Sequence, residues 1–107
     1  MPKTHWKKAL GYSSINSMPE KAGVYGFWST KGRCIYIGKA ERQTIRTRVM
    51  QEWKNSHNAK LKMWIKHFGK HLEICYNDTT HSPDRLETRL IRLFNPETNV
   101  RKQRRQP

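Results

Sequence analysis

The sequence predicts one small α+β domain, in which helices pack on a short sheet in the element order β-β-α-α-β-α. Its 107 residues are enough for a single domain. Two stretches, 24–28 and 34–37, are rich in β-branched and aromatic residues and flank a turn at 29–32, so they predict a hairpin. A third stretch, 72–76, alternates apolar and polar residues and predicts a half-buried strand. With three helical segments between and after them, these strands favour helices layered on a sheet over a doubly wound fold.

Three segments have the periodicity of amphipathic helices. The first, over 42–55, has apolar residues at every fourth position and therefore one apolar stripe. The second, over 58–68, ends before Gly69, a residue common at helix ends. The third begins after Ser82 as a cap, has proline and aspartate in its first turn, and runs to Phe94.

The chain is expected to consist of a central domain over 23–100, a basic N-terminal segment over 1–22 and a basic C-terminal tail over 101–107. No apolar run approaches the length of a membrane span, and the N-terminus lacks the apolar core of a secretory signal. We therefore expect a cytoplasmic protein that does not enter a membrane. Cys34 and Cys75 match no metal-ligand spacing and are expected to be reduced thiols, with a single disulfide as the alternative.

Positive charge dominates the composition. The chain has 22 Lys and Arg against 8 Asp and Glu, a formal net charge of +14. The tail holds four of the basic residues, so 18 remain in the rest of the chain. Such an excess destabilises a compact chain unless a partner neutralises it, and phosphate backbones are the usual partner. The charge favours nucleic-acid binding over an anionic membrane surface or a merely basic protein, and it says nothing about catalysis.

Two tyrosines are expected on one face of the predicted hairpin. If Trp28 pairs with Arg33, paired residue numbers add up to 61, and Tyr25 then lies directly opposite Tyr36. A turn shifted by one residue gives a sum of 63, and the tyrosines still share a face, whereas a three-residue loop would separate them. Gly23, Gly26 and Gly38 lie within two residues of the tyrosines, and glycine in a strand often marks a close approach to the backbone. The simpler interpretation is an aromatic pair that only stabilises the hairpin.

A carboxylate lies on the apolar stripe of the third helix. Glu87 precedes Ile91 by four residues and Phe94 by seven, so it shares their face. A buried carboxylate needs a compensating partner, and a metal cation is one. The alternative is a position at the edge of the stripe with an ion pair to one of three arginines: Arg85, Arg89 or Arg92.

These motifs resemble those of the GIY-YIG nuclease family. Gly23-Val24-Tyr25 and Tyr36-Ile37-Gly38, with ten residues between the tyrosines, are similar to the two half-motifs that name the family. The following helix of the family has a hydrophobic-x-x-Arg-hydrophobic signature, which residues 45–49 fit. The family's metal-binding glutamate, ahead of a Pro-x-x-Asn ending, corresponds to Glu87 ahead of 96–99. The resemblance spans 23–100 and implies a three-stranded antiparallel sheet flanked by helices.

The resemblance implies a metal-dependent endonuclease that hydrolyses DNA phosphodiester bonds. Glu87 would bind one divalent ion, Mg²⁺ or Mn²⁺, and Arg48 would donate hydrogen bonds to the phosphate. Tyr25 would orient or deprotonate the attacking water, and Tyr36 would assist by hydrogen bonding. A free phenol titrates near about 10, so a base role needs nearby positive charge, for which Lys39 is the candidate.

Two positions depart from the family pattern. The spacing after the second half-motif leaves Arg46 as an alternative to Arg48, which is preferred because apolar residues frame it as the signature requires. Four residues after this arginine many members carry His or Tyr, whereas this chain has Glu52. The nearest histidine is His57, which is kept as a candidate catalytic residue.

Further basic residues are expected to contact the DNA backbone, which adds affinity without sequence readout. They are Lys39, Arg42, Arg46, Arg101, Lys102, Arg104 and Arg105. Two other functions compete with the nuclease. One is a catalytically inactive GIY-YIG-like module that only binds nucleic acid, and the other is a basic RNA-binding protein, which would show no dependence on Mg²⁺.

Overall fold

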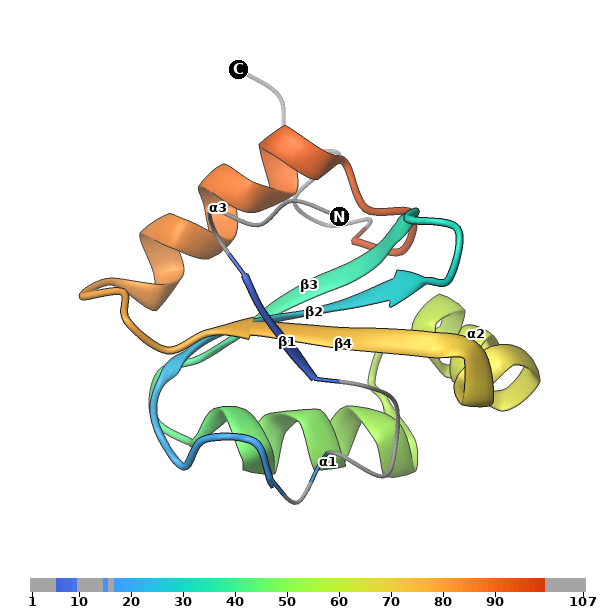
Figure 1. Cartoon of the computed structure of the whole chain (residues 1–107), viewed down its shortest axis with the longest axis horizontal. Helices are drawn as coiled ribbons and strands as arrows, with labels where there is room; N and C mark the ends of the chain where they lie inside the picture. Colours follow the sequence, from blue (N-terminus) through green and yellow to red (C-terminus); the bar gives the residue numbers. More distant parts are fainter. Residues whose placement is uncertain (1–5, 10–14, 16, 100–107) are drawn as a thin grey trace.

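Four antiparallel strands form the centre of the molecule, in the order β1-β4-β2-β3 (Figure 1). The structure, a computed structural model, describes residues 6–9, 15 and 17–99. The strands are β1 (Lys7–Ala9), β2 (Gly23–Ser29), β3 (Cys34–Ala40) and β4 (Leu72–Asn77). The helices are α1 (Ile45–Asn55), α2 (Ala59–Phe68) and α3 (Pro83–Phe94), with a short 3-10 turn, η2 (Gly69–His71), before β4.

The α+β class and the predicted order of six elements are confirmed, and one short strand joins them. β1 pairs with the edge of β4 that faces away from β2. At three residues it is too short for the alternation that predicts a strand. Trp6, just before β1, is buried and packs edge-on against Trp28, so part of the N-terminal segment belongs to the same core.

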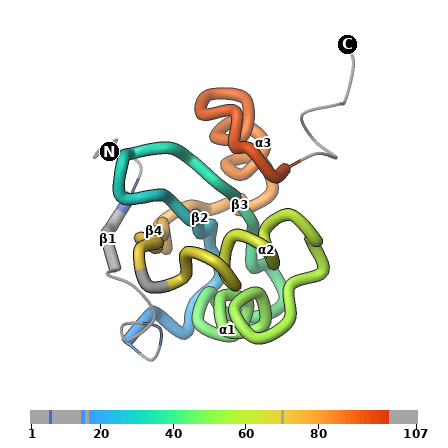
Figure 2. Tube along the Cα trace, turned by 90° about the vertical axis from the view of Figure 1, so that its right-hand side faces the viewer, coloured from blue at the N-terminus to red at the C-terminus, as the bar shows by residue number. Residues whose placement is uncertain are grey.

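Helices cover both faces of the sheet, because residues along each strand alternate between the two faces. α1 packs on one face with α2 beside it, and α3 packs on the opposite face (Figures 1 and 2). The core toward α1 includes Tyr25, Phe27, Ile35, Ala40, Ile45, Val49, Leu61, Leu72 and Ile74. The core toward α3 consists of Trp6, Val24, Trp28, Cys34, Ile37, Cys75, Leu90 and Ile91.

The hairpin of β2 and β3 has the shifted register. Tyr25 pairs with Gly38, and Phe27 pairs with Tyr36, so paired numbers add up to 63. Next to the turn, Ser29 N–H donates to the Arg33 carbonyl and Trp28 pairs with Cys34, which leaves a three-residue loop over 30–32. This loop was expected to separate the tyrosines, but a β-bulge between Phe27 and Trp28 restores the shifted register, so the tyrosines are not directly opposite each other and still share a face. The prediction that they share a face is confirmed, since their ring centroids lie 6.2 Å apart.

Polar caps set the helix ends. Thr44, in extended conformation, accepts a hydrogen bond from the backbone N–H of Thr47, so α1 begins at residue 45 and the predicted start at 42 is wrong. Asn58 caps α2, Ser82 caps α3 as predicted, and Asn95 ends α3 in the left-handed region at a φ of 47°. None of the described helices combines the length and apolarity needed to cross a membrane.

Cys34 and Cys75 are both free thiols in the core between the sheet and α3. The disulfide considered from the sequence is therefore absent between them. Burial, followed by the neighbouring Cys75, raises the pKa of Cys34 to about 12. The thiol is protonated at neutral pH and acts as a small apolar core group.

Candidate active site

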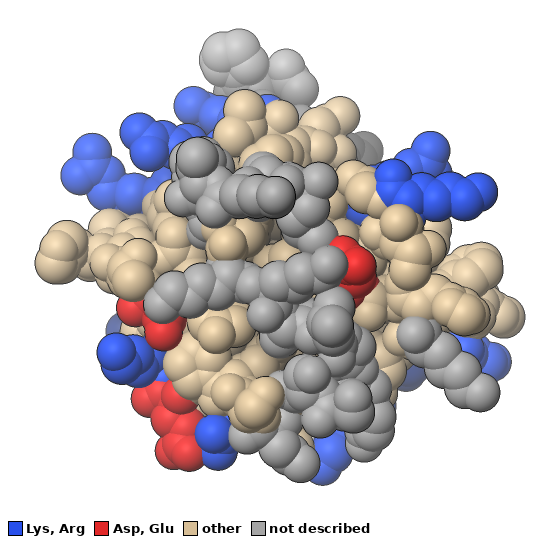
Figure 3. Space-filling view, viewed as in Figure 1, with Lys and Arg blue, Asp and Glu red and all other residues tan. Residues whose placement is uncertain are grey.

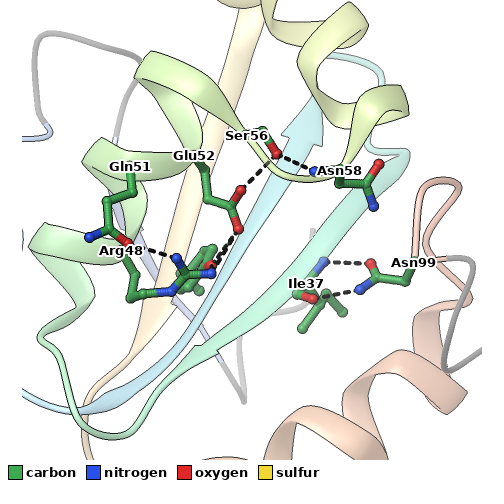
Figure 4. Close-up of polar contacts among 8 residues, drawn as sticks. Ile37, Arg48, Gln51, Glu52, Ser56, Asn58 and Asn99 are labelled. Atoms are coloured by element: carbon green, nitrogen blue, oxygen red, sulfur yellow. Dashed lines mark hydrogen bonds and ion pairs between the residues drawn. The ribbon is translucent and has the colours of Figure 1, made fainter.

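A buried carboxylate organises the polar residues between α1 and the sheet. Glu52 is 3% exposed, and its Oε2 atom accepts hydrogen bonds from the Tyr25 hydroxyl at 2.8 Å and from Arg48 Nη2 at 3.1 Å. Arg48 Nη2 also donates to the Tyr25 oxygen at 3.1 Å. Ser56 Oγ donates to the other carboxylate oxygen of Glu52 at 2.7 Å (Figure 4). Tyr25, Arg48 and Glu52 thus form a closed triangle of hydrogen bonds.

Helix and strand geometry bring these three residues together. Arg48 and Glu52 lie four residues apart on α1, so their side chains neighbour each other on one face. Tyr25 reaches the same space from β2, because its pairing partner on β3 is Gly38. A Cβ atom at Gly38 would lie 2.5 Å from both Cζ and Oη of Tyr25. The glycine of the second half-motif is therefore required for the phenol of the first to lie flat against β3.

Both tyrosines of the motif are held in the protonated form. The pKa of Tyr25 lies well above its ordinary value, first because of burial and then because of electrostatic interactions with Tyr36 and Glu52, while Arg48 acts in the opposite direction. Burial and Glu52 likewise raise the pKa of Tyr36. The positive charge that a phenolate base would need is present in Arg48, but burial outweighs its effect on the pKa of Tyr25.

Lys39 lies on the other face of the sheet. Its ammonium group pairs with Asp84 of α3 at 2.6 Å and with Glu41 at 3.2 Å. The hydrogen bond to Asp84 is the main cause that raises the pKa of Lys39. Because successive residues of a strand point to opposite faces, Gly38 faces Tyr25 and Lys39 faces α3. Lys39 is therefore not the cation that acts on Tyr25, although it follows the motif directly in sequence.

Glu87 is buried on α3, 8% exposed, as expected from its position on the apolar stripe. Its charge is one of the causes that raise the pKa of Tyr36 on β3, so the two groups interact electrostatically. The part of the chain that the structure describes contains no cluster of three or more His, Cys, Asp or Glu suited to a metal. One carboxylate fits Mg²⁺, which keeps several waters, and does not fit a structural zinc ion.

The Pro-x-x-Asn ending binds the edge of β3. The side-chain amide of Asn99 accepts a hydrogen bond from the Ile37 N–H at 2.7 Å and donates one to the Ile37 carbonyl at 2.7 Å (Figure 4). The backbone N–H and the hydroxyl of Thr98 both donate to the carbonyl of Ile35, at 2.9 and 2.7 Å. The segment after α3 therefore fixes the position of the second half-motif.

We expect Asn99→Ala to lower the free energy of unfolding by about 2–4 kcal/mol, because it leaves a buried N–H and a buried carbonyl of Ile37 without this partner. Urea denaturation followed by circular dichroism measures the change. Asn55→Ala is the matched control, since Asn55 is exposed and accepts only from Lys62, and it should change the stability by less than about 0.5 kcal/mol. Equal stability of the two variants would contradict the role given to Asn99.

The structure separates the two candidate arginines. Arg46 pairs with Glu20 and donates to the carbonyl of Met18, whereas Arg48 contacts Tyr25. Arg42 is exposed just before α1. Arg101, Lys102, Arg104 and Arg105 lie outside the described residues.

His57 is exposed between α1 and α2, and no hydrogen bond of the described residues connects it to Glu52.

From the sequence, Glu52 was noted only as a departure from the family pattern and was not selected as a site residue. A usable signal was present, because Glu52 follows Val49 by three residues and so shares its buried face. The argument that selected Glu87 also applies to Glu52.

The fold and the site define a GIY-YIG nuclease domain. Its motif tyrosines lie on adjacent strands, an arginine lies on the following helix, and a buried glutamate lies on a later helix. The model of the UvrC-like GIY-YIG domain matches residues 21–100, and the chain belongs to this family. The UvrABC system protein C of Caldanaerobacter subterraneus subsp. tengcongensis is 35% identical over 88 residues, and that of Clostridium acetobutylicum is 32% identical over 88 residues. The match covers 80% of this chain and 14% of each relative, so the chain spans a small part of their length.

Solved structures of the N-terminal GIY-YIG endonuclease domain of UvrC from Thermotoga maritima have the same fold. A tyrosine-to-phenylalanine variant aligns with a TM-score of 0.61 at 31% identity, over 83% of this chain and 93% of that one. An asparagine-to-alanine variant aligns with a TM-score of 0.62 at 31% identity, over the same shares. Both are bound to the catalytic divalent cation.

Proposed function

We propose that this chain is a metal-dependent endonuclease domain that hydrolyses DNA phosphodiester bonds. The observation that carries the proposal is the arrangement at β3. Tyr25 and Arg48 lie on the α1 side of this strand, and the charge of Glu87, buried on α3, acts on Tyr36. Membership of a family whose solved members are endonuclease domains with a catalytic divalent cation supports the same conclusion.

Each residue has a role that its chemistry allows. Glu87 would hold one ion, Mg²⁺ or Mn²⁺, which when bound supplies positive charge to the phosphate and the leaving oxygen. Arg48 would donate to the phosphate with its planar fork of N–H groups. Tyr25 would orient the attacking water and take up its proton, and Tyr36 would hold the water or phosphate by hydrogen bonding.

A row of three arginines on α3 supports contact with DNA. From the sequence, these arginines were considered only as ion-pair partners of Glu87. Arg85, Arg89 and Arg92 are exposed at positions i, i+4 and i+7, so they line one outer face of α3. Figure 3 shows basic side chains gathered along this side of the molecule. We propose that this row contacts DNA phosphates.

The basic residues chosen from the sequence add to this surface to different extents. Arg42 is free to contribute from its exposed position, whereas Lys39 and Arg46 are each held in ion pairs with surface carboxylates. We also propose, from their charge alone, that four residues of the tail contact DNA phosphates: Arg101, Lys102, Arg104 and Arg105. A cytoplasmic location, where thiols stay reduced, agrees with the free Cys34 and Cys75.

The test is cleavage of supercoiled plasmid in Mg²⁺, in Mn²⁺ and in EDTA. We expect nicked circles in either metal and intact plasmid in EDTA, because negative charge that develops on the phosphate needs a cation. DNA binding in EDTA, followed by fluorescence anisotropy, should weaken steeply as salt rises, because bound phosphates release counterions. If the chain binds DNA but leaves duplex, single-stranded and branched DNA intact in both metals, it is a binding module rather than a nuclease.

A further inference from the structure

The proton of Tyr25 needs an acceptor if Tyr25 activates water, and this inference rests on the proposed nuclease function. Tyr25 is fully buried and its pKa is raised well above the ordinary value, so a standing phenolate at neutral pH is excluded as the base. A phenol can still take a proton from water if it passes its own proton on at the same time. The question is which group receives that proton.

The hydrogen bonds of the described residues give one answer. The Tyr25 hydroxyl donates to Glu52 Oε2 at 2.8 Å, while its other neighbour, Arg48, is itself a donor and cannot accept. Among the described residues, Glu52 is thus the acceptor that the hydrogen-bond geometry gives to the phenolic proton.

We propose that Glu52 is a positioning residue that accepts the phenolic proton of Tyr25 while the Tyr25 oxygen takes a proton from the attacking water. The phenolic O–H bond breaks as an O–H bond to Glu52 forms, and an O–H bond of water breaks as the phenol is re-formed. The resulting hydroxide attacks phosphorus, and the bond from phosphorus to the leaving sugar oxygen breaks. That oxygen takes a proton from solvent, which balances the proton that Glu52 later returns.

The surroundings of Glu52 suit this transfer. Arg48 Nη2 lies 3.1 Å from the Tyr25 oxygen and 3.1 Å from Glu52 Oε2, so the same cation stabilises negative charge on either oxygen. Ser56 holds the second carboxylate oxygen at 2.7 Å, and the Asn58 N–H holds the Ser56 hydroxyl at 3.0 Å. The carboxylate therefore keeps one orientation toward Tyr25.

The cluster meets solvent through its arginine. The side chain of Arg48 is 22% exposed, whereas Glu52 is 3% exposed and Tyr25 is fully buried. A phosphate that engages Arg48 therefore reaches the side of the triangle where the phenol oxygen lies. A dry environment for the transfer also strengthens the interactions of the charges within it.

A Glu52 that acts only through the effect of its charge on the tyrosine pKa values makes the opposite prediction. Its charge raises the pKa of both Tyr25 and Tyr36, so its loss would make a phenolate easier to form. If Glu52 only repelled charge, removing that charge would raise the activity. If Glu52 accepts the proton, removing its basicity lowers the activity.

The test compares the nicking kinetics of Glu52→Gln with wild type on supercoiled plasmid in Mg²⁺. We expect kcat to fall about 100-fold, as is usual for loss of a proton acceptor, while KM changes little. The double variant Tyr25→Phe/Glu52→Gln should be no slower than Tyr25→Phe alone, because Glu52 acts through Tyr25. Glu97→Gln is the matched control, since Glu97 pairs with Arg33 on the surface, and its kcat should stay at the wild-type level.

Two results would overturn the inference: a Glu52→Gln variant at least as active as wild type, or losses from Tyr25→Phe and Glu52→Gln that multiply. If Glu52→Gln does not fold by circular dichroism, Glu52→His decides. Its imidazole accepts protons, so a folded histidine variant within about tenfold of wild type supports the inference, and a folded one slower by about 100-fold or more opposes it. Cleavage by wild type with no effect at Glu52 removes only this inference, whereas no cleavage by wild type removes the proposed function as well.

Discussion

Glu87→Ala is expected to lower the rate of plasmid cleavage by at least about 10³-fold, because the cation that offsets charge on the phosphate would lose its proposed protein ligand. Glu87 is buried and its charge acts on the second motif tyrosine, and the described residues offer no cluster of carboxylates or histidines that could replace it. Single-turnover nicking in Mg²⁺ measures the rate, and calorimetric titration with Mn²⁺ measures the loss of metal binding.

Glu97→Ala is the control for the Glu87 experiment. Glu97 is also a carboxylate close to β3, but it pairs with Arg33 at the surface with 38% of its side chain exposed. Its removal should leave cleavage and Mn²⁺ binding unchanged. Cleavage by Glu87→Ala within about tenfold of wild type would show that the ion is held elsewhere, because a lost metal ligand costs far more.

Gly38→Ala is expected to damage both stability and catalysis. The added Cβ would lie 2.5 Å from Cζ and Oη of Tyr25, whose ring is fully buried and whose hydroxyl is hydrogen-bonded to Glu52 and Arg48. Overpacking of this kind costs about 1–3 kcal/mol in unfolding free energy, and we expect the upper end of that range. Displacement of the phenol by about 1 Å should lower kcat about 100-fold. Urea denaturation and plasmid nicking measure the two effects.

A double-mutant cycle separates the clash from a general intolerance of β3 to substitution. In a Tyr25→Leu background the ring is absent, so adding Gly38→Ala should cost less than about 0.5 kcal/mol. If the glycine replacement is equally costly with and without the ring, the contact between Tyr25 and Gly38 is not the reason for the glycine in the second half-motif.

Local patterns predicted most of the fold because each element had its own signal. The alternation of 72–76, the apolar stripe of α1 and the Ser82 cap all gave the correct element in the correct order. The hairpin register was predicted only to within one residue, because the bulge beside the turn depends on packing that periodicity does not contain. β1 was missed because its three residues are held by pairing with β4 rather than by a pattern of their own.

The site was less predictable than the fold, because proximity in sequence and proximity in space differ. Lys39 follows the second half-motif directly, yet strand alternation turns it away from Tyr25. Glu52 looked like a missing family residue, and only the packing of α1 on the sheet shows that its carboxylate is buried against Tyr25. Residues that matched a motif were easier to select than a residue that differed from it.

The hydrogen bonds that Asn99 and Thr98 make to β3 have a consequence for how copies of this domain meet. An open strand edge is a template on which another chain can extend the sheet, which leads to aggregation. Here the carbonyls of Ile35 and Ile37 at the β3 edge already have partners from the segment after α3. At the opposite edge, β1 occupies the outer side of β4 with only three residues. Intermolecular strand addition is thereby disfavoured at both edges of the sheet, so copies of this domain can come close together without joining their sheets.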